Sequence, residues 1–467
     1  MGSLRQPVET IWKQVGRYNL AMLERESGAG SVQHVLQACR DHDVKFIRLW
    51  FTDILGMLKS VAITVEELKH ALTDGITFDG AAIEGFARRD EADMIAMPDP
   101  ASFQVLPWRP RPNAVARMFC DIYRTNGEPF EGDPRQVLKR TLRRAADQGY
   151  TFYVSPEIEY FYFKDAQGTV PLDQGGYFDL TPLDGGSDLR RETVLMLEEL
   201  GIGVALSHHE VAPSQHEMDL RYTDALTMAD AVMTFRLVVK EVAMRHGVYA
   251  TFMPKPMAGQ NGSAMHLQLS LFRGEQNAFF DAADAEQLSG DARHYMAGLL
   301  RHAGEIALVT NQWVNSYKRL VPGYEAPTYA TWSHHSNADL VRVPERKPGM
   351  DEATRIEYRA PDPATNPYLA FAVVLAAGFA GIDGKYDLPM PTQSAHKLSD
   401  AQRAERGIES LPASLGEAIE RFDQSALMRT ALGDHIVDSL VANKRLEWNA
   451  YQQQVSPYEL NRYLGLL

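Results

Sequence analysis

The sequence has little cysteine and no long hydrophobic segment. Its 467 residues include two cysteines, Cys39 and Cys120, and neither lies in a Cys-x-x-Cys pair. This usage argues against a disulfide framework and is typical of a reduced cytoplasmic protein. Residues 1–30 are polar and lack the apolar core of a signal peptide, and no stretch of about 18 apolar residues occurs. We therefore expect a cytoplasmic protein without a membrane span.

Basic residues are also in the minority. The chain has 47 lysines and arginines against 61 aspartates and glutamates, which gives a formal net charge of −14. This balance argues against nonspecific binding to nucleic acid or to anionic membranes. The length favours two domains, and no internal repeat or low-complexity segment is present. We predict a helical N-terminal extension over 1–30, a small α+β domain over 31–125 and a larger domain over 126–467.

Hydrophobic periodicity and turn residues predict the order of elements. The expected helices are 31–42, Thr64–Gly75 with Glu67 at the capping-box spacing, Asp133–Gly149 with Pro134 at its first position, 187–200, 224–246, 367–382 and much of 415–451. The expected strands are 45–51, 151–163, 203–210, 249–253, 264–272 and 353–359. This order predicts an antiparallel or mixed sheet backed by helices in the larger domain.

Two glutamates in one expected strand point to a metal site. Glu157 and Glu159 lie in the aromatic and β-branched run 153–163, and alternation along a strand places both carboxylates on the same face. Like charges in an apolar strand repel each other and lose hydration, which is costly unless a cation compensates. A single Glu-x-Glu is more often a solvated sheet edge, so this pair needs further support.

Other segments supply that support. The run 208–217 contains Glu210 and Glu217, although it would also suit a polar loop. On the two later strands, alternation places His266, Gln268 and Ser270 on one face of 264–272, and Arg355, Glu357 and Arg359 on one face of 353–359. A lone histidine is more often a satisfied polar residue, but several such faces together favour a site. Five glutamates and one histidine without cysteine select Mg²⁺ or Mn²⁺, and more than one ion.

Basic residues gather late in this acidic chain. The group consists of Lys318, Arg319, Arg342, Arg346, Lys347, Arg355 and Arg359. Arginine forks suit carboxylate and phosphate, so the group predicts an anionic substrate. Arg346 and Lys347 would also fit ordinary surface charge. Arg319 and Arg359 are better candidates because they lie in apolar or strand contexts.

Longer motifs resemble those of type I glutamine synthetases from about residue 31 to residue 467. The matching segments are Phe51-Thr-Asp-Ile-Leu-Gly56, Phe78-Asp-Gly80, Pro156-Glu-Ile-Glu159, His209-Glu-Val-Ala-Pro213, Pro254-Lys-Pro256, Asn261-Gly-Ser263, Asn315-Ser-Tyr-Lys-Arg-Leu-Val-Pro-Gly-Tyr-Glu-Ala-Pro327 and Asn366-Pro-Tyr368. The resemblance implies an α+β protein with a small β-grasp N-terminal domain and a catalytic domain whose curved antiparallel sheet is backed by helices. It also implies a dodecamer of two hexameric rings, with active sites between subunits.

The resemblance further implies a ligand set and a reaction. One ion would bind Glu159, Glu210 and Glu217, and another would bind Glu157, His266 and Glu357. ATP would phosphorylate the γ-carboxylate of glutamate, and a nitrogen nucleophile would then displace phosphate. The implied glutamate-binding residues are Glu159, Asn261, Gly262, Arg319 and Arg359, and the ATP-binding residues are Ser270, Arg342, Lys347 and Arg355. The nucleophile pocket would consist of Asp53 from the adjacent subunit, acting as base, with Tyr177, Glu210 and the loop residue Glu325.

Departures from the family pattern bear on the nucleophile. An arginine that normally faces the transferred phosphoryl group is Asn337 here, and losing one such donor typically costs about 10²–10³ in turnover. Trp313 replaces a common small residue, and Ala81-Ala82 replaces a common serine pair. These departures favour a primary amine as nitrogen donor, and thus a γ-glutamylamide synthetase. The alternatives are ammonia, giving glutamine, and a weakly active regulatory homologue, against which the complete set of metal ligands argues.

Overall fold

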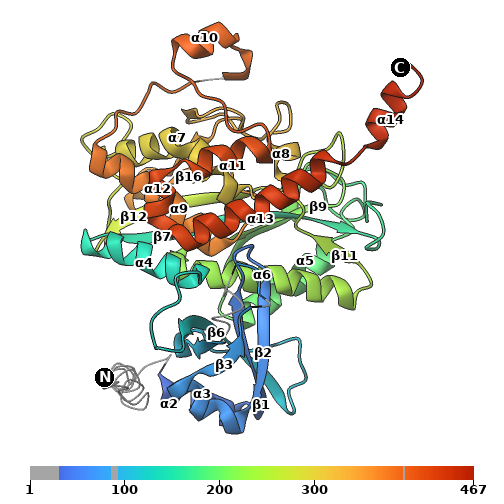
Figure 1. Cartoon of the computed structure of the whole chain (residues 1–467), viewed down its shortest axis with the longest axis vertical. Coiled ribbons are helices and arrows are strands. Elements are labelled where there is room, and N and C mark those ends of the chain that lie inside the picture. Colours follow the sequence, from blue (N-terminus) through green and yellow to red (C-terminus); the bar gives the residue numbers. More distant parts are fainter. Residues whose placement is uncertain (1–30, 82, 86–92, 393–394) are drawn as a thin grey trace, which may run out of the picture.

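The computed structural model describes residues 31–81, 83–85, 93–392 and 395–467. These residues form two β-sheets, a small one within residues 44–124 and a large one within residues 151–358. Figure 1 shows the small sheet and its two helices below the large sheet and the helices that cover it. The fold is therefore α+β, as predicted. The expected helical extension over residues 1–30 lies outside the described residues.

The small sheet has six strands. Its order is β2 (Leu58–Thr64), β1 (Val44–Thr52), β6 (Ala114–Arg124), β4 (Asp93–Pro98) and β3 (Ile76–Asp79), with β5 (Gln104–Val105) also paired to β6. The β1 and β6 strands run parallel, and the other pairs are antiparallel. Apolar side chains such as Ile47, Leu49 and Met118 are fully buried and form a core of their own against α2 (Val32–Asp41) and α3 (Leu68–Asp74).

The helix starts in this region confirm the helix expected over 31–42 and correct the one expected from Thr64. Ser31 caps α2, because its side chain accepts a hydrogen bond from the backbone N–H of His34 at 3.1 Å. The capping box expected at Thr64 and Glu67 is wrong. A 3₁₀ turn over Val65–Glu67 precedes α3, and the Thr64 hydroxyl pairs with the neighbouring Glu66 side chain instead. Ser and Thr side chains bond readily to nearby groups, so the spacing alone did not fix the partner.

The large sheet has ten strands and carries the polar residues singled out above. Its order is β14 (Trp332–Ser333), β15 (Val341–Arg342), β16 (Ile356–Tyr358), β12 (Met265–Arg273), β7 (Thr151–Phe163), β9 (Gln215–Leu220) and β8 (Val204–His209), with β10 (Thr223–Asp224) and β11 (Tyr249–Thr251) on β7 and β13 (Gln276–Asn277) on β12. Neighbouring strands are antiparallel except β14 and β15. Strand β9 was not predicted, since its polar sequence resembled a loop.

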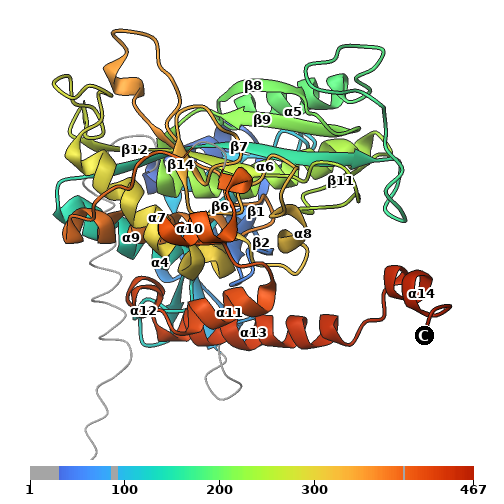
Figure 2. The ribbon, with the colours of Figure 1, turned by 90° about the horizontal axis from the view of Figure 1, so that it is seen from above.

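Helices cover one side of this sheet. The helices of this part of the described chain are α4 (Pro134–Asp147), α5 (Ser187–Glu199), α6 (Ala225–Arg245), α7 (Gly290–Thr310), α8 (Ser316–Arg319), α9 (Pro367–Gly384), α10 (Asp400–Glu405), α11 (Leu415–Asp423), α12 (Ala426–Leu432), α13 (Asp434–Gln452) and α14 (Pro457–Tyr463). Of these, α10 and α14 project away from the sheet (Figure 1). In Figure 2, α4, α6, α7 and α9 lie next to the sheet, and α11, α12 and α13 form a further layer beyond them. The helical structure expected over much of 415–451 is thus divided into three helices.

Helix α9 is strongly apolar along its whole length. It is the one described helix long and apolar enough to cross a membrane, with a mean hydropathy of 1.5. However, 67% of the 18-residue window is buried inside the protein. A helix that is apolar on all sides and packed among other helices is a core helix.

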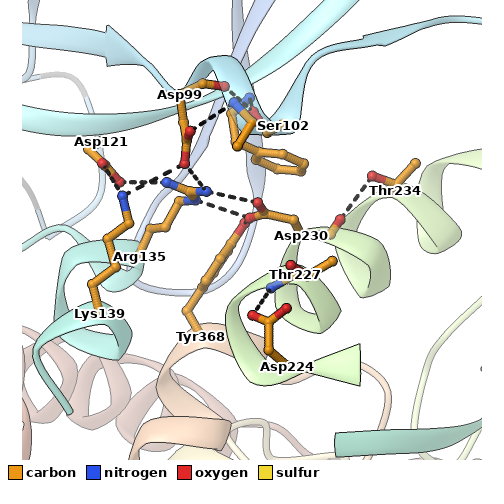
Figure 3. A network of polar contacts seen from close by, with 12 residues as sticks. Asp99, Ser102, Asp121, Arg135, Lys139, Asp224, Thr227, Asp230, Thr234 and Tyr368 are labelled. Carbon is orange, nitrogen blue, oxygen red and sulfur yellow. Dashed lines mark hydrogen bonds and ion pairs between the residues drawn. The ribbon is translucent and has the colours of Figure 1, made fainter. Parts of the chain in front are cut away.

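A polar network joins the small sheet to helices that pack on the large one (Figure 3). Arg135 on α4 is 3% exposed and pairs with Asp99 at 2.8 Å, with Asp121 at 2.7 Å and with Asp230 on α6 at 2.9 Å. Tyr368 on α9 donates a further hydrogen bond to Asp230 at 2.6 Å. Because Asp99 follows β4 and Asp121 lies on β6, one guanidinium ties the small sheet to two helices of the large one.

Candidate functional site

A cavity of about 440 Å³ opens on the polar face of the large sheet. Its acidic lining residues are Glu157, Glu159, Glu210, Glu217, Asp219, Glu325 and Glu357, and its basic or imidazole residues are His208, His266, Arg319, Arg342 and Arg359. The structure therefore brings together all six residues that were predicted as metal ligands, from four strands and the turn after β8.

Strand pairing explains why these side chains meet. Glu157 and Glu159 face the cavity, whereas Ile158 and Tyr160 between and beyond them are fully buried on the core side. Across the sheet, His266 on β12 lies opposite Glu157, and Glu217 on β9 lies opposite Glu159. The register of three adjacent strands thus fixes the positions of the carboxylates.

The first group of ligand-type atoms comprises Glu157, His266 and Glu357. One donor atom from each lies within 4.8 Å of the others, and His266 Nδ1 is 3.4 Å from a Glu157 oxygen. Burial, reinforced by the nearby Arg359, holds the pKa of His266 well below its usual value, so the ring is neutral. Neutral imidazole is the form that binds a metal ion.

The second group comprises His208, Glu210 and Glu217, again with donor atoms within 4.8 Å of one another. Glu159 lies beside this group in the cavity wall. One of its oxygens accepts hydrogen bonds from Gln215 Nε2 at 2.8 Å and from the backbone N–H of Ala264 at 2.9 Å. These contacts hold the Glu159 carboxylate in a fixed orientation beside the other acids.

Crowded acids disfavour ionisation in the metal-free protein. Burial, followed by the neighbouring Glu210, raises the pKa of Glu159 to about 8. Burial and Glu157 raise the pKa of Asp219 to about 7, and burial also raises that of Glu217 well above its usual value. A divalent cation would reverse this cost, since it stabilises the ionised carboxylates. The oxygen and imidazole donors, without thiolate, fit Mg²⁺ or Mn²⁺.

Arginines form another part of the cavity wall, in contact with one of the acids. Arg342 Nη1 donates to Glu357 at 2.7 Å, and Arg359 also donates to Glu357. Arg319 is 2% exposed, and its guanidinium donates to the backbone oxygens of Ala360 and Arg359 at 2.7 and 3.0 Å. The cavity therefore holds three guanidinium groups close to the acids, which suits the anionic groups of a substrate.

Asn261, Gly262 and Glu325 border the arginine wall. The Asn261 amide donates to Glu325 at 3.0 Å, and the Gly262 oxygen accepts from Gln215 Nε2 at 3.0 Å. A Cβ atom at position 262 would lie 2.3 Å from the Pro254 backbone oxygen, so only glycine fits this approach. The predicted glutamate-binding residues are thus gathered in one part of the cavity.

An exposed apolar rim lies next to Glu210. Tyr177, Phe178, Leu206 and Val211 line the cavity, and they are 57%, 59%, 59% and 46% exposed. The rings of Tyr177 and Phe178 stack with centroids 4.2 Å apart. The predicted nucleophile residue Tyr177 therefore belongs to a larger apolar surface that sequence analysis did not identify.

Asp173 fastens the segment that carries Tyr177 and Phe178 of this rim. Its carboxylate accepts hydrogen bonds from the backbone N–H groups of Ser214 at 2.9 Å and Gly185 at 2.8 Å, and from His209 Nε2 at 2.9 Å. The other nitrogen of His209 contacts the backbone oxygen of Glu210 at 2.6 Å. Although burial opposes the charged ring, Asp173 raises the pKa of His209, so the two form a buried ion pair.

Asp173 and His209 also lie near His216, which makes a third group of ligand-type atoms. Both nitrogens of His209 already contact oxygens, and the Arg190 guanidinium lies 2.8 Å from His216 Nδ1. A fixed cation at that position would repel a metal ion. We interpret this group as a hydrogen-bonded support for Glu210 and Glu217.

Asp53 does not reach the cavity of its own chain. It lies in the turn between β1 and β2, is 2% exposed, and accepts hydrogen bonds from the backbone N–H groups of Leu55 at 3.0 Å and Met57 at 2.9 Å. Lys59 forms an ion pair with it at 3.0 Å. A role at the nucleophile pocket therefore requires a second copy of the chain.

Other predicted residues lie outside the cavity lining. Arg355 donates to Gln268 at 2.9 Å, and Gln268 donates to Glu157 at 2.8 Å, so Arg355 acts on the first group only through Gln268. Ser270 lies on β12 opposite Tyr153, and Lys347 is exposed in the loop after β15. Of the four predicted ATP-binding residues, only Arg342 lines the cavity.

The two atypical residues, Asn337 and Trp313, line different cavities. Asn337 lines the acidic cavity, and its backbone oxygen accepts a hydrogen bond from Arg359 Nε at 3.1 Å. Trp313 lines a different cavity, where its Nε1 donates to the Ala364 backbone oxygen at 3.1 Å. The interpretation of Trp313 as a nucleophile-site marker therefore has no support within one chain.

Two cavity residues with ligand-type side chains, His208 and Asp219, were missed by sequence analysis. His208 shares a face with Glu210, and Asp219 shares a face with Glu217, so alternation carried a signal for both. The expected strand 203–210 contained His208, but no strand was expected over 215–220, so the pairing that brings both residues to the cavity was not predicted. With β8 and β9 paired, His208 lies opposite Glu217 and Leu206 lies opposite Asp219.

Comparisons with known proteins cover nearly the whole chain. Residues 43–125 match the family model of the glutamine synthetase β-grasp domain, and residues 131–463 match that of the glutamine synthetase catalytic domain. A glutamine synthetase of Mycolicibacterium smegmatis is 51% identical over 93% of this chain and 99% of its own length. One of Methanosarcina mazei is 50% identical over 93% and 98%.

Solved structures with the same fold include one titled "GmaS/ADP complex-Conformation 1". It superposes with a TM-score of 0.83 at 31% sequence identity, and the match covers 92% of this chain and 99% of that one. A second, titled "Apo GmaS without ligand", has a TM-score of 0.81 at 32% identity over 92% and 99% of the two chains.

Proposed function

The chain belongs to the glutamine synthetase family, and we propose that it forms a γ-glutamyl amide from glutamate and a primary amine. Membership makes it an ATP-dependent carbon–nitrogen ligase. The finer assignment rests on the apolar rim of Tyr177, Phe178, Leu206 and Val211 beside Glu210. Ammonia has no apolar part to place there, whereas an alkyl or aryl amine has one.

The proposed roles follow the division of the cavity. Arg319 and Arg359, with Asn261 and Gly262, would hold glutamate, and Glu159 would face its amino-acid end. Arg342 would face the ATP phosphates, with Ser270, Lys347 and Arg355 farther along the nucleotide. Two or more Mg²⁺ or Mn²⁺ ions would neutralise the transferred phosphoryl group when bound. The reacting carboxylate is thereby placed between cations, which favours its attack on ATP.

The two ligand groups fit two ions. We propose that Glu157, His266 and Glu357 hold one ion and that Glu159, Glu210 and Glu217 hold the other, with His208 beside the second. Glu325, which joins Asn261, would close over the acyl phosphate and exclude water. The amine nitrogen would then attack the acyl carbon and release phosphate.

The incoming amine must lose a proton before attack. We propose that Asp53 of a neighbouring copy accepts this proton, opposite Tyr177 and Glu210. This role implies a homo-oligomer with sites between subunits, for which a cytoplasmic dodecamer of two hexameric rings is the proposed form. The proposed division into 1–30, 31–125 and 126–467 places Asp53 on one domain and the metal ligands on the other.

Ammonia is the second candidate donor. It is favoured by the relatives at 50–51% identity, which are named glutamine synthetase. Asn337 argues for the amine, because a lost arginine changes the charge beside the transferred phosphoryl group. A weakly active regulatory homologue remains the third possibility, and the six gathered ligand side chains argue against it.

Phosphate release from ATP in the presence of glutamate distinguishes the donors. Ammonium, methylamine, isopropylamine, ethanolamine, putrescine and aniline would be compared at equal concentrations of the free base. We expect kcat/KM for at least one amine to exceed that for ammonium about tenfold or more. Turnover with ammonium alone would identify the protein as a glutamine synthetase. Absence of turnover with every donor would support the regulatory alternative.

A variant of the rim sharpens this test. Leu206→Asn removes apolar contact, so kcat/KM for the preferred amine should fall roughly tenfold while that for ammonium changes little. Leu195→Asn is the matched control, since Leu195 is 49% exposed on α5 and does not line the cavity. Equal losses for amine and ammonium in Leu206→Asn would contradict the role of the rim.

A further inference from the structure

A second and larger cavity, of about 590 Å³, lies where the two domains meet. It is bounded by residues 56–58 of the β1–β2 turn, by α6 and by the end of α13. It shares no lining residue with the acidic cavity within the described part of the chain. Its volume is typical of a site for a small organic ligand.

Most of its wall is apolar. Met233 and Leu237 contribute from α6, Phe252 lies on the segment after β11, and Trp313 closes the far side. The Trp313 ring is held by its hydrogen bond to Ala364 and by the Lys444 ammonium, 3.7 Å from the ring centroid. A fixed aromatic wall of this kind binds the apolar part of a ligand.

The charges of this cavity are unbalanced. Arg236 and Lys240 lie one turn apart on α6 and both line it, with Lys318 across the opening. No described carboxylate forms an ion pair with Arg236 or Lys240. Arg236 is 9% exposed, its Nη2 donates to the Thr365 backbone oxygen, and its buried Nε has no partner. Like charges at this helical spacing repel each other and favour an anion between them.

The one acidic lining residue does not supply that anion. Glu447 accepts a hydrogen bond from the backbone N–H of Val314 at 2.9 Å through one oxygen and pairs with Lys444 at 2.9 Å through the other. Lys444 is itself fully buried, so Glu447 is already neutralised. Burial also lowers the pKa of Arg236 to about 10, although the negative charge of the nearby Asp362 partly opposes this shift.

We propose that this cavity binds an amphipathic carboxylate, with its anionic group at Arg236 and Lys240 and its apolar part against Met233, Phe252 and Trp313. A guanidinium beside an ammonium suits a carboxylate, and the apolar wall selects a compact anionic head on a hydrophobic body. The site is separate from the proposed reaction. Its ligand would also contact Gly56 and Met57, and so restrain the turn that contains Asp53.

Binding to the full-length, assembled protein tests the proposal directly. The probe is 4-phenylbutanoate, measured by calorimetry and by the change in tryptophan fluorescence, with 4-phenylbutanamide as its neutral isostere and inorganic phosphate as a bare anion. We expect the carboxylate to bind at least about tenfold more tightly than either comparison compound. Trp313→Phe should remove most of the fluorescence change without abolishing the calorimetric signal.

Charge variants then locate the anion. Lys240→Gln should weaken probe binding about tenfold and Lys240→Arg should largely restore it, whereas Lys164→Gln, at an exposed lysine that does not line the cavity, should have no effect. Hydrogen exchange in the peptide covering 53–58 should slow when the probe is bound. Absent binding, equal binding of acid and amide, equal binding of phosphate, or insensitivity to Lys240→Gln would each overturn the proposal. None of these measurements depends on which nitrogen donor the enzyme uses.

Discussion

Single carboxylates decide the chemistry of the acidic cavity, because each is placed by strand register. Glu157 faces His266 across β7 and β12, and Gln268 donates to its second oxygen at 2.8 Å. An amide at position 157 would keep the shape and lose the charge. The effect of such a change therefore separates metal binding from packing.

We predict that Glu157→Gln lowers kcat at least about 10²-fold while the fold and the assembly persist. The loss follows because a neutral amide neutralises no cation and binds Mg²⁺ weakly. Phosphate release over a range of Mg²⁺ concentrations, with size-exclusion chromatography, provides the measurement. Glu192→Gln is the control, since Glu192 pairs with Arg245 outside the cavity. Unchanged activity in Glu157→Gln would refute the ligand assignment.

Residue-scale predictions from sequence succeeded where alternation was clear. The shared face of Glu157 and Glu159 and the cavity-facing side of His266 followed from a period of two in apolar strands. Trp313 could not be placed in this way, because it lies in a turn between α7 and α8 whose path depends on tertiary contacts. Its position in another cavity became visible only with the fold.

At the scale of elements, the segment 173–186 holds the apolar rim in place. Asp173 ties its beginning to Gly185 near its end, and to Ser214 in the turn between β8 and β9. Phe178 has a φ of 61°, a left-handed conformation that is strained for an aromatic residue. Such a conformation persists only where surrounding contacts enforce it.

Asp173→Asn should therefore loosen the rim. We predict an increase of roughly tenfold in KM for the amine, little change in KM for ATP, and a loss of about 1–3 kcal/mol in the free energy of unfolding, because the buried His209 cation loses its partner. Steady-state kinetics with each substrate varied in turn would measure this. Asp165→Asn is the control, since Asp165 is exposed and caps only the local turn at Gln167. Equal increases in the KM values for the amine, ATP and glutamate would contradict a specific role in positioning the rim.

The joint between the domains depends on one guanidinium. Arg135 contacts three carboxylates, so its removal leaves Asp230 without a cation, and Asp99 and Asp121 with Lys139 alone. We predict that Arg135→Met lowers the free energy of unfolding by about 3–5 kcal/mol, measured by denaturant unfolding. Arg191→Met should change it by less than about 1 kcal/mol, because Arg191 is 68% exposed in its pair with Asp188. A similar small effect of Arg135→Met would show that the joint is held by apolar packing instead.

Element predictions from sequence were best for long amphipathic segments and worst for short polar ones. The helix at Asp133-Pro134 and the strand over 151–163 were found with nearly their observed bounds. Strand β9 escaped because Gln215, His216 and Glu217 are buried polar residues, whose partners lie on other strands and are absent from the local sequence. Local propensity does not record such nonlocal pairing.

At the scale of the whole molecule, the two sheets place different parts of the proposed site on different surfaces. The metal ligands face the large-sheet cavity, whereas Asp53 is held in the small sheet's turn by Asn366, whose amide donates to the Asp53 and Ile54 backbone oxygens at 3.1 and 3.2 Å. The sequence predicted the α+β fold and this division through its resemblance to known motifs. That Asp53 lies outside the acidic cavity of its own chain could be seen only in the structure.

Metal binding should couple to the stability of the whole molecule in a pH-dependent way. In the metal-free protein the pKa of Glu159 is raised to about 8 and that of Asp219 to about 7, so both groups favour the folded state when protonated. Their contribution to stability is complete below about pH 4, which is near the pKa of such carboxyl groups in the unfolded chain. It is lost as the pH rises through about 7–8. Metal ions compete with these protons, so their stabilising effect should grow over the same interval.

We therefore predict that the increase in melting temperature caused by Mg²⁺ or Mn²⁺, relative to a chelator, is larger at about pH 8.5 than at about pH 6. Each tenfold gain in apparent metal affinity with pH adds about 1.4 kcal/mol to stability at saturating metal. Thermal melts with matched ionic strength would measure the difference. The Glu157→Gln variant should show a smaller metal-dependent increase at both pH values, because one ion loses a charged ligand. A metal effect that is equal at both pH values, or larger at the lower one, would show that the crowded carboxylates do not hold the ions.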